Sequence, residues 1–199
     1  MAKKKSFFAS DQFAKVLAED VSQAKQRMEN DPTESHRREF VRATCSAIDA
    51  QAWQLKMYVI ESVLTKKTTS VHDISALKEE SYAINDKGEI YVQPRGYSLK
   101  VGLRLVYSIL KKHDVPVHID FGSTDWKNID DAVKIRNRVM HPKCMGDISV
   151  SESDAECCYN AFLFVHNMLL TTILDSVLAS LNKVATGGGK SQFFTSGKE

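Results

Sequence analysis

The sequence lacks the features that mark metal-binding, disulfide-stabilised and membrane-spanning proteins. Its four cysteines include no Cys-x-x-Cys pair, and the adjacent Cys157 and Cys158 are poorly placed for an ordinary disulfide or for two zinc ligands. The longest apolar run, from residue 161 to 174, covers about 14 residues, fewer than the roughly 18 that a membrane span needs. We therefore expect reduced thiols, no metal, no cofactor and no membrane contact.

A strong charge and a targeting signal are also missing. Lysine and arginine outnumber aspartate and glutamate only by 27 to 25, so overall charge does not identify a nucleic-acid binder. Any such function must rest on local clustering of charge. The basic start at residues 3–5 is followed by charged residues instead of an apolar stretch, which is not the pattern of a secretory signal. We expect a cytoplasmic protein.

What the sequence does contain is helical periodicity over most of a chain of 199 residues, which is long enough for one domain with a substantial core. A first helix is predicted over residues 10–30. A second is predicted to begin with Asp31 as cap and Pro32 in the first turn and to stop near residues 66–69. Further helices are predicted at about 70–84, 98–112, 124–141 and 151–183. The last is apolar around most of its circumference, so it must be central or lie at a subunit contact.

Short extended segments and a tail complete the predicted organisation. Turn residues at 85–88 precede Ile90-Tyr91-Val92, the best strand candidate, and residues 117–121 are its predicted partner. The chain is therefore predicted to be all-α, an up-and-down helical bundle over residues 1–185 with a small extended or hairpin insertion near residues 85–121. The glycine-rich tail, residues 186–199, is expected to be disordered.

The most informative segment is Arg136-Asn137-Arg138-Val139-Met140-His141, in the helix that Ser123 or Thr124 can cap. At about 100° per residue, Arg136 falls inside an apolar arc. The members of that arc are Trp126, Ile129, Ala132, Val133, Val139 and Met140. A guanidinium at an apolar contact has to be paired or hydrogen-bonded, because leaving it desolvated and alone costs several kcal/mol. Arg136 is therefore either part of a structural ion pair or a functional group.

His141 lies five positions after Arg136, about 140° round an ideal helix. The two side chains can converge only if the helix unwinds at its end or a second subunit completes the site. Pro142 supplies a reason for unwinding, because a proline disfavours helical geometry in the residue before it. The helix C-terminus favours a protonated imidazole, which suits His141 for proton transfer near neutral pH. Asn137 is on the same side as His141 and could orient the ring or a phosphate oxygen.

Arg136-Asn137-x-x-x-His141 resembles the Arg-x(4–6)-His motif of the HEPN superfamily, in which a polar residue, often Asn, follows the arginine. The resemblance implies a HEPN-type bundle and a metal-independent endoribonuclease, often a toxin or an anti-phage defence effector, whose site forms at a homodimer interface. On this resemblance Arg136 would bind the scissile phosphate of RNA, and His141 would act as general base or acid for attack by the ribose 2′-hydroxyl. The products would be a 2′,3′-cyclic phosphate and a 5′-hydroxyl.

Other charged residues near the motif fit an RNA substrate. Lys134, Arg138 and Lys143 add local positive charge that could contact phosphates. Lys143 stands where some HEPN toxins have a tyrosine, which weakens the expectation of a nucleotidyltransferase antitoxin, although the resemblance still implies an antitoxin or other regulatory partner. The basic run at residues 36–38 is a second candidate for RNA contact, but a charge run at a helix start is usually a solvated face.

Alternative interpretations stay open at this level. Arg136 and His141 could be an ion-paired arginine and a helix-capping histidine, and Asp49 could pair with the site or be a solvated or capping residue. For the whole protein, one alternative is a catalytically inactive HEPN-type module that dimerises and binds RNA, a nucleotide or a partner protein. Another is an α-helical adaptor. The first alternative shares its fold with the ribonuclease, so the fold cannot separate the two.

Overall fold

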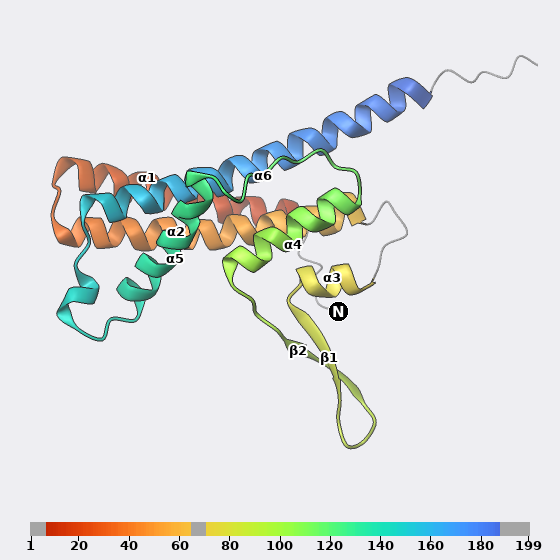
Figure 1. Cartoon of the computed structure of the whole chain (residues 1–199), viewed down its shortest axis with the longest axis horizontal. Coiled ribbons are helices and arrows are strands. Elements are labelled where there is room, and N and C mark those ends of the chain that lie inside the picture. Colours follow the sequence, from red (N-terminus) through yellow and green to blue (C-terminus); the bar gives the residue numbers. More distant parts are fainter. Residues whose placement is uncertain (1–6, 65–70, 188–199) are drawn as a thin grey trace, which may run out of the picture.

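The computed structural model describes residues 7–64 and 71–187, which are mostly helical (Figure 1). The long helices α1 (Phe7–Asn30), α2 (Glu34–Tyr58) and α6 (Glu152–Gly187) run along the length of the molecule, and α2 packs against both of the others. The helix α5 (Thr124–Met140) packs on α2 and α6, and α4 (Leu99–Lys112) packs on α2. The predicted all-α class is therefore confirmed.

Hydroxyl side chains begin three of the helices, as expected for residues that can accept the unpaired N–H groups of a first turn. Ser98 accepts from the Val101 N–H at 3.5 Å and Ser123 accepts from the Trp126 N–H at 3.2 Å, both at predicted helix starts. The predicted cap of α2 was wrong, because Thr33 accepts from the His36 N–H at 3.3 Å. The Thr33 N–H also donates to the Asp31 carbonyl at 2.8 Å, and this turn keeps Asp31 and Pro32 outside the helix.

The segment after α2 differs most from the prediction. The helix continues as a π-helical turn, η1 (Val59–Leu64), and its predicted end at 66–69 lies outside the described residues. The next helix, α3 (Val71–Leu77), is shorter than the predicted 70–84. It ends because Glu79 adopts a φ of 58° in the left-handed region, which redirects the chain into a strand.

That strand, β1 (Glu80–Ile84), pairs antiparallel with β2 (Ile90–Pro94), with Tyr82 opposite Val92. The predicted pairing of the second strand with residues 117–121 was therefore wrong. The Asn85–Gly88 turn joins two adjacent strands, and a local hairpin needs far less loop-closure entropy than a distant partner. Val117, Ile119 and Phe121 instead pack, half-buried, against the core. The hairpin projects from the bundle in Figure 1, so the insertion lies at 80–94.

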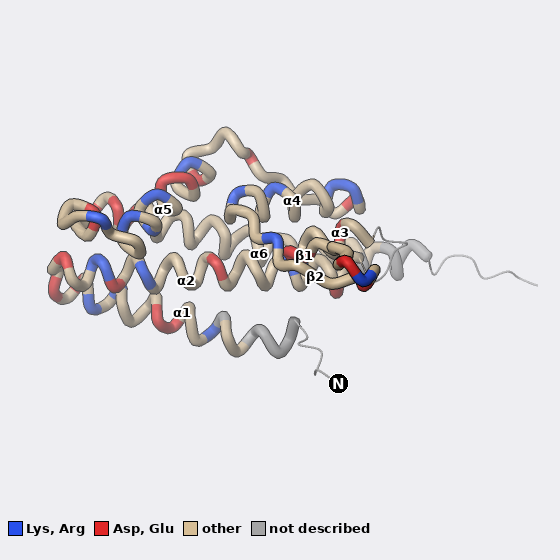
Figure 2. Tube along the Cα trace, turned by 90° about the horizontal axis from the view of Figure 1, so that it is seen from below, with Lys and Arg blue, Asp and Glu red and all other residues tan. Residues whose placement is uncertain are grey.

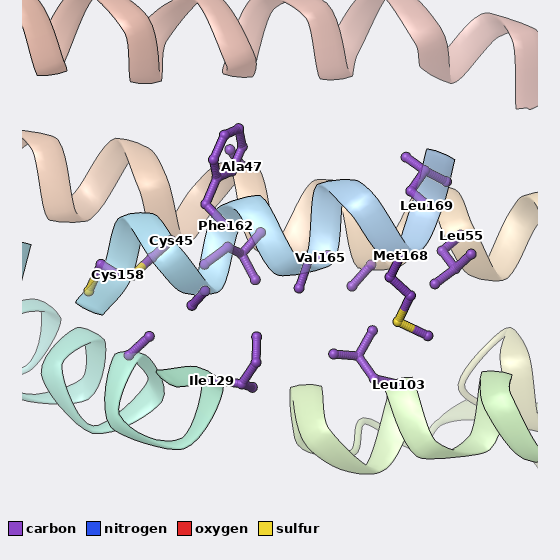
Figure 3. Packing of buried hydrophobic residues seen from close by; sticks show 14 of the residues in the cluster. Cys45, Ala47, Leu55, Leu103, Ile129, Cys158, Phe162, Val165, Met168 and Leu169 are labelled. Atoms are coloured by element: carbon purple, nitrogen blue, oxygen red, sulfur yellow. The ribbon is translucent and has the colours of Figure 1, made fainter. Parts of the chain in front are cut away.

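The core lies where α6 crosses α2 and the two shorter helices (Figure 3). Leu55 of α2, Leu103 of α4 and Ile129 of α5 are fully buried there, together with Val165 of α6. The prediction that the last helix is central is therefore confirmed for its first half. Thr186 and Gly187 belong to α6, whereas the rest of the expected disordered tail, residues 188–199, lies outside the described residues.

The second half of α6 is apolar without being buried. Leu174, Val177, Leu178 and Leu181 are each about half exposed or more. By length and composition alone, the stretch Glu152–Ala179, which contains an 18-residue window of mean hydropathy 1.6, could cross a membrane. The core helix of a soluble protein passes the same test, and packing against α2 and α5 accounts for the apolar residues of the first half.

Replacing Ser123 with Ala is expected to lower the free energy of unfolding by about 1 kcal/mol, because the variant leaves the Trp126 N–H without its side-chain acceptor. Urea denaturation followed by circular dichroism measures the change. Thr124→Ala, one residue later and exposed, is the matched control and should leave the unfolding midpoint nearly unchanged. Equal midpoints for Ser123→Ala and wild type would mean that the cap does not stabilise α5.

Candidate functional site

The helix that carries the motif faces α2 across an open cleft of about 410 Å³, within the usual size range of ligand sites. Residues of α2, α4, α5 and the segments flanking the hairpin line it. The polar ones are Asp49, Lys56, Glu79, Ser98, Arg136 and Asn137. Two of the predicted site residues, Arg136 and Asn137, therefore belong to the cleft, and the remaining polar groups come from elements distant in sequence.

Arg136 forms an ion pair with Asp49, with 2.9 Å between Nη2 and Oδ2, and both side chains are a little under half exposed. The predicted apolar arc of α5 was partly wrong. Met140 is 47% exposed and Val133 is only half-buried, whereas Ile135 is buried. The buried face runs through Trp126, Ile129, Ala132, Ile135 and Val139, so Arg136 lies at its edge. The guanidinium is thus fixed by its carboxylate partner and still open to the cleft.

The environment of Asp49 carries a net cost for its ionised form. Partial burial raises the pKa of Asp49 above its ordinary value, and the attraction of Arg136 and Lys56 only partly offsets this effect. Glu79 adds a smaller repulsion in the same direction as burial. Asp49 is also the only charged residue of α2 between Arg42 and Lys56. The cations Arg136 and Lys56 therefore favour the ionised form of Asp49, and burial opposes it.

A second ion pair, Lys56 with Glu79, forms another wall of the cleft. The Lys56 side chain is only 8% exposed, and its ammonium group lies 4.7 Å from the centre of the Tyr97 ring. Gly102 of α4 makes room, because a Cβ there would come within 3.1 Å of Tyr97 and 3.2 Å of Lys56. Burial, with a contribution from Glu79, raises the pKa of Tyr97 to about 12, so its hydroxyl stays neutral and donates to the Ala76 carbonyl at 2.6 Å.

His141 lies immediately after the last residue of α5. Its N–H still donates to the Asn137 carbonyl at 3.0 Å, but its backbone has left helical geometry, with φ −129° and ψ 57°. The residue is exposed and does not line the cleft that holds Arg136. The predicted unwinding before Pro142 is therefore observed. Within one chain, the cleft brings together Arg136, Asn137 and Asp49 without the imidazole.

The cations around the motif are mostly engaged. Lys134 pairs with Asp131 at 2.7 Å, and Figure 2 shows both signs of charge mixed along α5. Arg138 pairs with Asp154 at 2.9 Å and donates to the carbonyls of Asp147, at 3.3 Å, and Ser149. Lys143 is exposed, and its backbone N–H donates to the Asp147 carboxylate at 2.7 Å. Arg138 therefore holds the chain that follows the motif.

The basic run at the start of α2 has a similar structural role. Arg37 donates to the Val150 carbonyl at 2.8 Å, and Arg38 donates to the Ile148 carbonyl at 3.3 Å. Both carbonyls belong to the connection between α5 and α6, which includes the 3-10 turn η2 (Met145–Ile148). Together with Arg138, these guanidinium groups fix that connection from two helices, which leaves them less available for RNA.

Several residues of the cleft were not predicted from the sequence, namely Trp53, Lys56, Glu79 and Tyr97. A signal did exist for two of them, because Asp49, Trp53 and Lys56 follow each other at spacings of about one helical turn and so share one face of α2. Glu79 and Tyr97 flank the hairpin, and only the correct hairpin register brings them together. Among the described residues, no group of His, Cys, Asp and Glu side chains is arranged to hold a metal ion.

Comparison with known proteins gives no assignment. No family model matches the chain, and no match was found among curated proteins or solved structures. The function must therefore be inferred from the site itself.

Asp49→Asn is expected to leave the protein as stable as the wild type, or more stable, at pH 7. The raised pKa of Asp49 means that the native state prefers the protonated carboxyl, so ionisation at neutral pH costs stability. Well below the ordinary Asp pKa of about 3.9, near pH 3, the carboxyl is mostly protonated in both folded and unfolded chains, and the advantage of Asn should disappear. Urea unfolding at both pH values measures this. A variant clearly less stable at pH 7 would mean that the Arg136 ion pair outweighs desolvation.

Asp154→Asn should have the opposite effect. Partial burial alone would raise the pKa of Asp154, but hydrogen bonds from Ser151 and Arg138 outweigh it and lower that pKa. The ionised carboxylate therefore stabilises the fold at neutral pH, and this contribution is lost as the pH falls into the ordinary carboxyl range. We expect a loss of about 1 kcal/mol at pH 7, typical of a helix cap, which shrinks as the pH falls below the ordinary Asp pKa toward the lowered pKa of the folded chain. Glu156→Gln, on exposed α6 surface, is the control and should change stability little.

Proposed function

We propose that the chain is a metal-independent endoribonuclease that cleaves RNA with Arg136 and His141. The observation that carries the proposal is the state of Arg136, a guanidinium held by Asp49 in an open cleft, five residues before an exposed imidazole at the end of the same helix. A cation for the phosphate and a group that moves protons are the two components that cleavage by a ribose 2′-hydroxyl requires. The resemblance of Arg136-Asn137-x-x-x-His141 to the HEPN motif supports the same chemistry.

Arg136 would bind the phosphate to be cleaved. A guanidinium has five N–H donors, and the ion pair commits Nη2 to Asp49, which leaves donors for phosphate oxygens. As the 2′-oxygen attacks phosphorus, negative charge grows on the non-bridging oxygens, and a fixed cation lowers the barrier by stabilising it. Asp49 would act as a positioning residue, because it limits the orientations that the Arg136 side chain can adopt.

His141 would transfer protons. A neutral imidazole accepts the proton of the attacking 2′-hydroxyl, and an imidazolium donates a proton to the departing 5′-oxygen. The P–O5′ bond breaks as the O2′–P bond forms, which gives a 2′,3′-cyclic phosphate and a 5′-hydroxyl end. One imidazole cannot be both the base and the acid in a single concerted step. We propose that His141 of a second copy of the chain would be the second proton-transfer group.

A homodimer also fits the surface of the late helices. His141 is exposed outside the cleft of its own chain, and the second half of α6 presents Leu174, Val177, Leu178 and Leu181 to the surroundings. Covering that face with a second copy would bury apolar area, and the proposed site would take its second imidazole from the other subunit. In this form the protein would be a cytoplasmic toxin or anti-phage defence effector.

The alternative is a catalytically inactive HEPN-type module that dimerises and binds RNA, a nucleotide or a partner protein. The observation in its favour is that the cleft of one chain holds Arg136 without His141. In that case the cleft would bind its ligand through the same Asp49–Arg136 pair, and His141 would only end the helix.

Arg136→Ala and His141→Ala are each expected to lower the rate of RNA cleavage by about 100-fold or more, the range for removing a charge-stabilising or proton-transferring group. The assay uses labelled single-stranded RNA in EDTA, with mass spectrometry of the product ends. Arg95→Ala and His118→Ala, both exposed and outside the cleft, are the matched controls and should retain activity.

Cleavage abolished by EDTA, or unaffected by either substitution, would refute this mechanism. RNA binding by a wild-type chain that cleaves no RNA would favour the inactive module. Size-exclusion chromatography with light scattering measures the mass of the assembly and so tests for a dimer. Leu174→Glu should convert the dimer to a monomer if the exposed half of α6 forms the interface.

A further inference from the structure

The cleft beside Arg136 has more features than phosphate binding requires. Its walls carry two carboxylate–cation pairs, Asp49 with Arg136 and Lys56 with Glu79, so both hydrogen-bond acceptors and donors line it. Asp49 is 45% exposed at its side chain, which leaves this carboxylate able to accept hydrogen bonds from a ligand. A site for phosphate alone would need only the cations.

An aromatic ring is also open to the cleft. Trp53 of α2 lines it and is 42% exposed, whereas the other tryptophan, Trp126, is 3% exposed in the core. A large indole left half in solvent loses the free energy of burial that Trp126 gains. Flat rings in this setting are the usual platforms on which unpaired nucleobases stack.

The part of the cleft wall next to the hairpin is held rigidly. The Lys56 side chain is more than nine-tenths buried, packs over the Tyr97 ring and pairs with Glu79. Glu79 has a φ of 58°, a conformation that residues other than glycine seldom adopt. Its N–H donates to the Ala76 carbonyl at 3.0 Å, and its carbonyl accepts from the Arg95 N–H at 2.7 Å, so this backbone is fixed on both sides. Uncommon backbone geometry of this kind concentrates at binding sites.

We propose that the cleft binds one unpaired guanine base, stacked on Trp53 and recognised by the Asp49 carboxylate with Arg136 beside it. This inference rests on the proposed function for the adjacent phosphate site and adds to it the base that the enzyme selects. The shared chemistry is the guanine ring, which a single-stranded RNA or a free guanine nucleotide can supply.

Guanine fits because of the order of groups on its Watson–Crick edge. Its N1–H and N2–H₂ are adjacent donors that a carboxylate accepts together, and O6 beside them is an acceptor for a neighbouring cation. Adenine and cytosine each present a ring nitrogen acceptor next to their amino group, which a carboxylate repels. Uracil has a single donor between two acceptors. Among the four bases, guanine alone matches a carboxylate flanked by a guanidinium.

Isothermal titration calorimetry with GMP and AMP tests the inference on the full chain. GMP should bind at least about tenfold more tightly than AMP, the discrimination expected of one bidentate contact. Trp53→Ala should weaken GMP binding about tenfold or more, through loss of stacking, and Trp53→Phe should restore most of it. Asp49→Asn should abolish the preference for GMP over AMP, because the amide replaces one of the two acceptor oxygens with an N–H₂ donor and cannot accept from N1–H and N2–H₂ side by side.

Matched controls come from outside the cleft. Tyr91→Ala removes an aromatic ring of similar exposure from the hairpin, and Asp131→Asn removes a carboxylate that is also ion-paired, to Lys134. Both should leave GMP binding unchanged. Thermal unfolding of each variant establishes that it is folded before it is titrated.

A second arm separates the two sources of guanine. The probes are hexanucleotides of uridine with one guanosine or one adenosine, with a 2′-O-methyl group on every nucleotide. They cannot be cleaved, since every 2′-hydroxyl that could attack is blocked. Preference for the guanine oligonucleotide assigns the cleft to RNA, and preference seen only with GMP assigns it to the free nucleotide. The inference would be overturned if neither GMP nor the guanine oligonucleotide bound more tightly than its adenine counterpart. It would also be overturned if Trp53→Ala and Asp49→Asn left the affinity for the guanine ligand unchanged.

The two proposals can fail separately. RNA cleavage with no base preference would refute the guanine site and support the ribonuclease. Guanine-selective binding without cleavage of RNA would support the guanine site and refute the ribonuclease.

Discussion

The burial of α2 is the constraint on which the rest of the molecule depends. This helix packs against α1, α4, α5 and α6, and it buries Phe40, Val41 and Leu55 almost completely. Polar side chains on a helix so enclosed need partners. Gln51 accordingly lies 3.0 Å from the ring of His166, and Lys56 pairs with Glu79. The cleft exists because α2 shows a partly open face, with Asp49 and Trp53, between α4 and α5.

The sequence predicts those parts of the fold that local physics controls. Apolar periodicity and hydroxyl caps locate α4 and α5 closely, because Ser98 and Ser123 act within one turn of the helix they begin. The predicted partner of the second strand was wrong for a nonlocal reason. Residues 117–121 have the alternation of a strand, but they pack on the core and not on another strand. The left-handed turn at Glu79, which ends α3, has no local signal such as glycine.

The candidate site divides in the same way. Arg136 could be identified as a cation that needs a partner, because its place on the helix follows from spacing alone. The identity of that partner could not be predicted, since Asp49 is 87 residues away from Arg136 in the sequence. Only the packing of α5 on α2 brings the two side chains to 2.9 Å from each other. The raised pKa of Asp49 adds information that spacing lacks, because a carboxylate kept at an energetic cost is typical of binding and catalytic sites.

The three arginines that hold the α5–α6 connection limit what the end of α5 can do. Arg37, Arg38 and Arg138 bind successive carbonyls between Asp147 and Val150, close after His141. The backbone beyond the imidazole is therefore tethered to two helices, and large swings of the chain are restricted there. The His141 side chain can reorient mainly by rotation about its own bonds. In the proposed reaction, the substrate or a neighbouring subunit would therefore have to approach the imidazole.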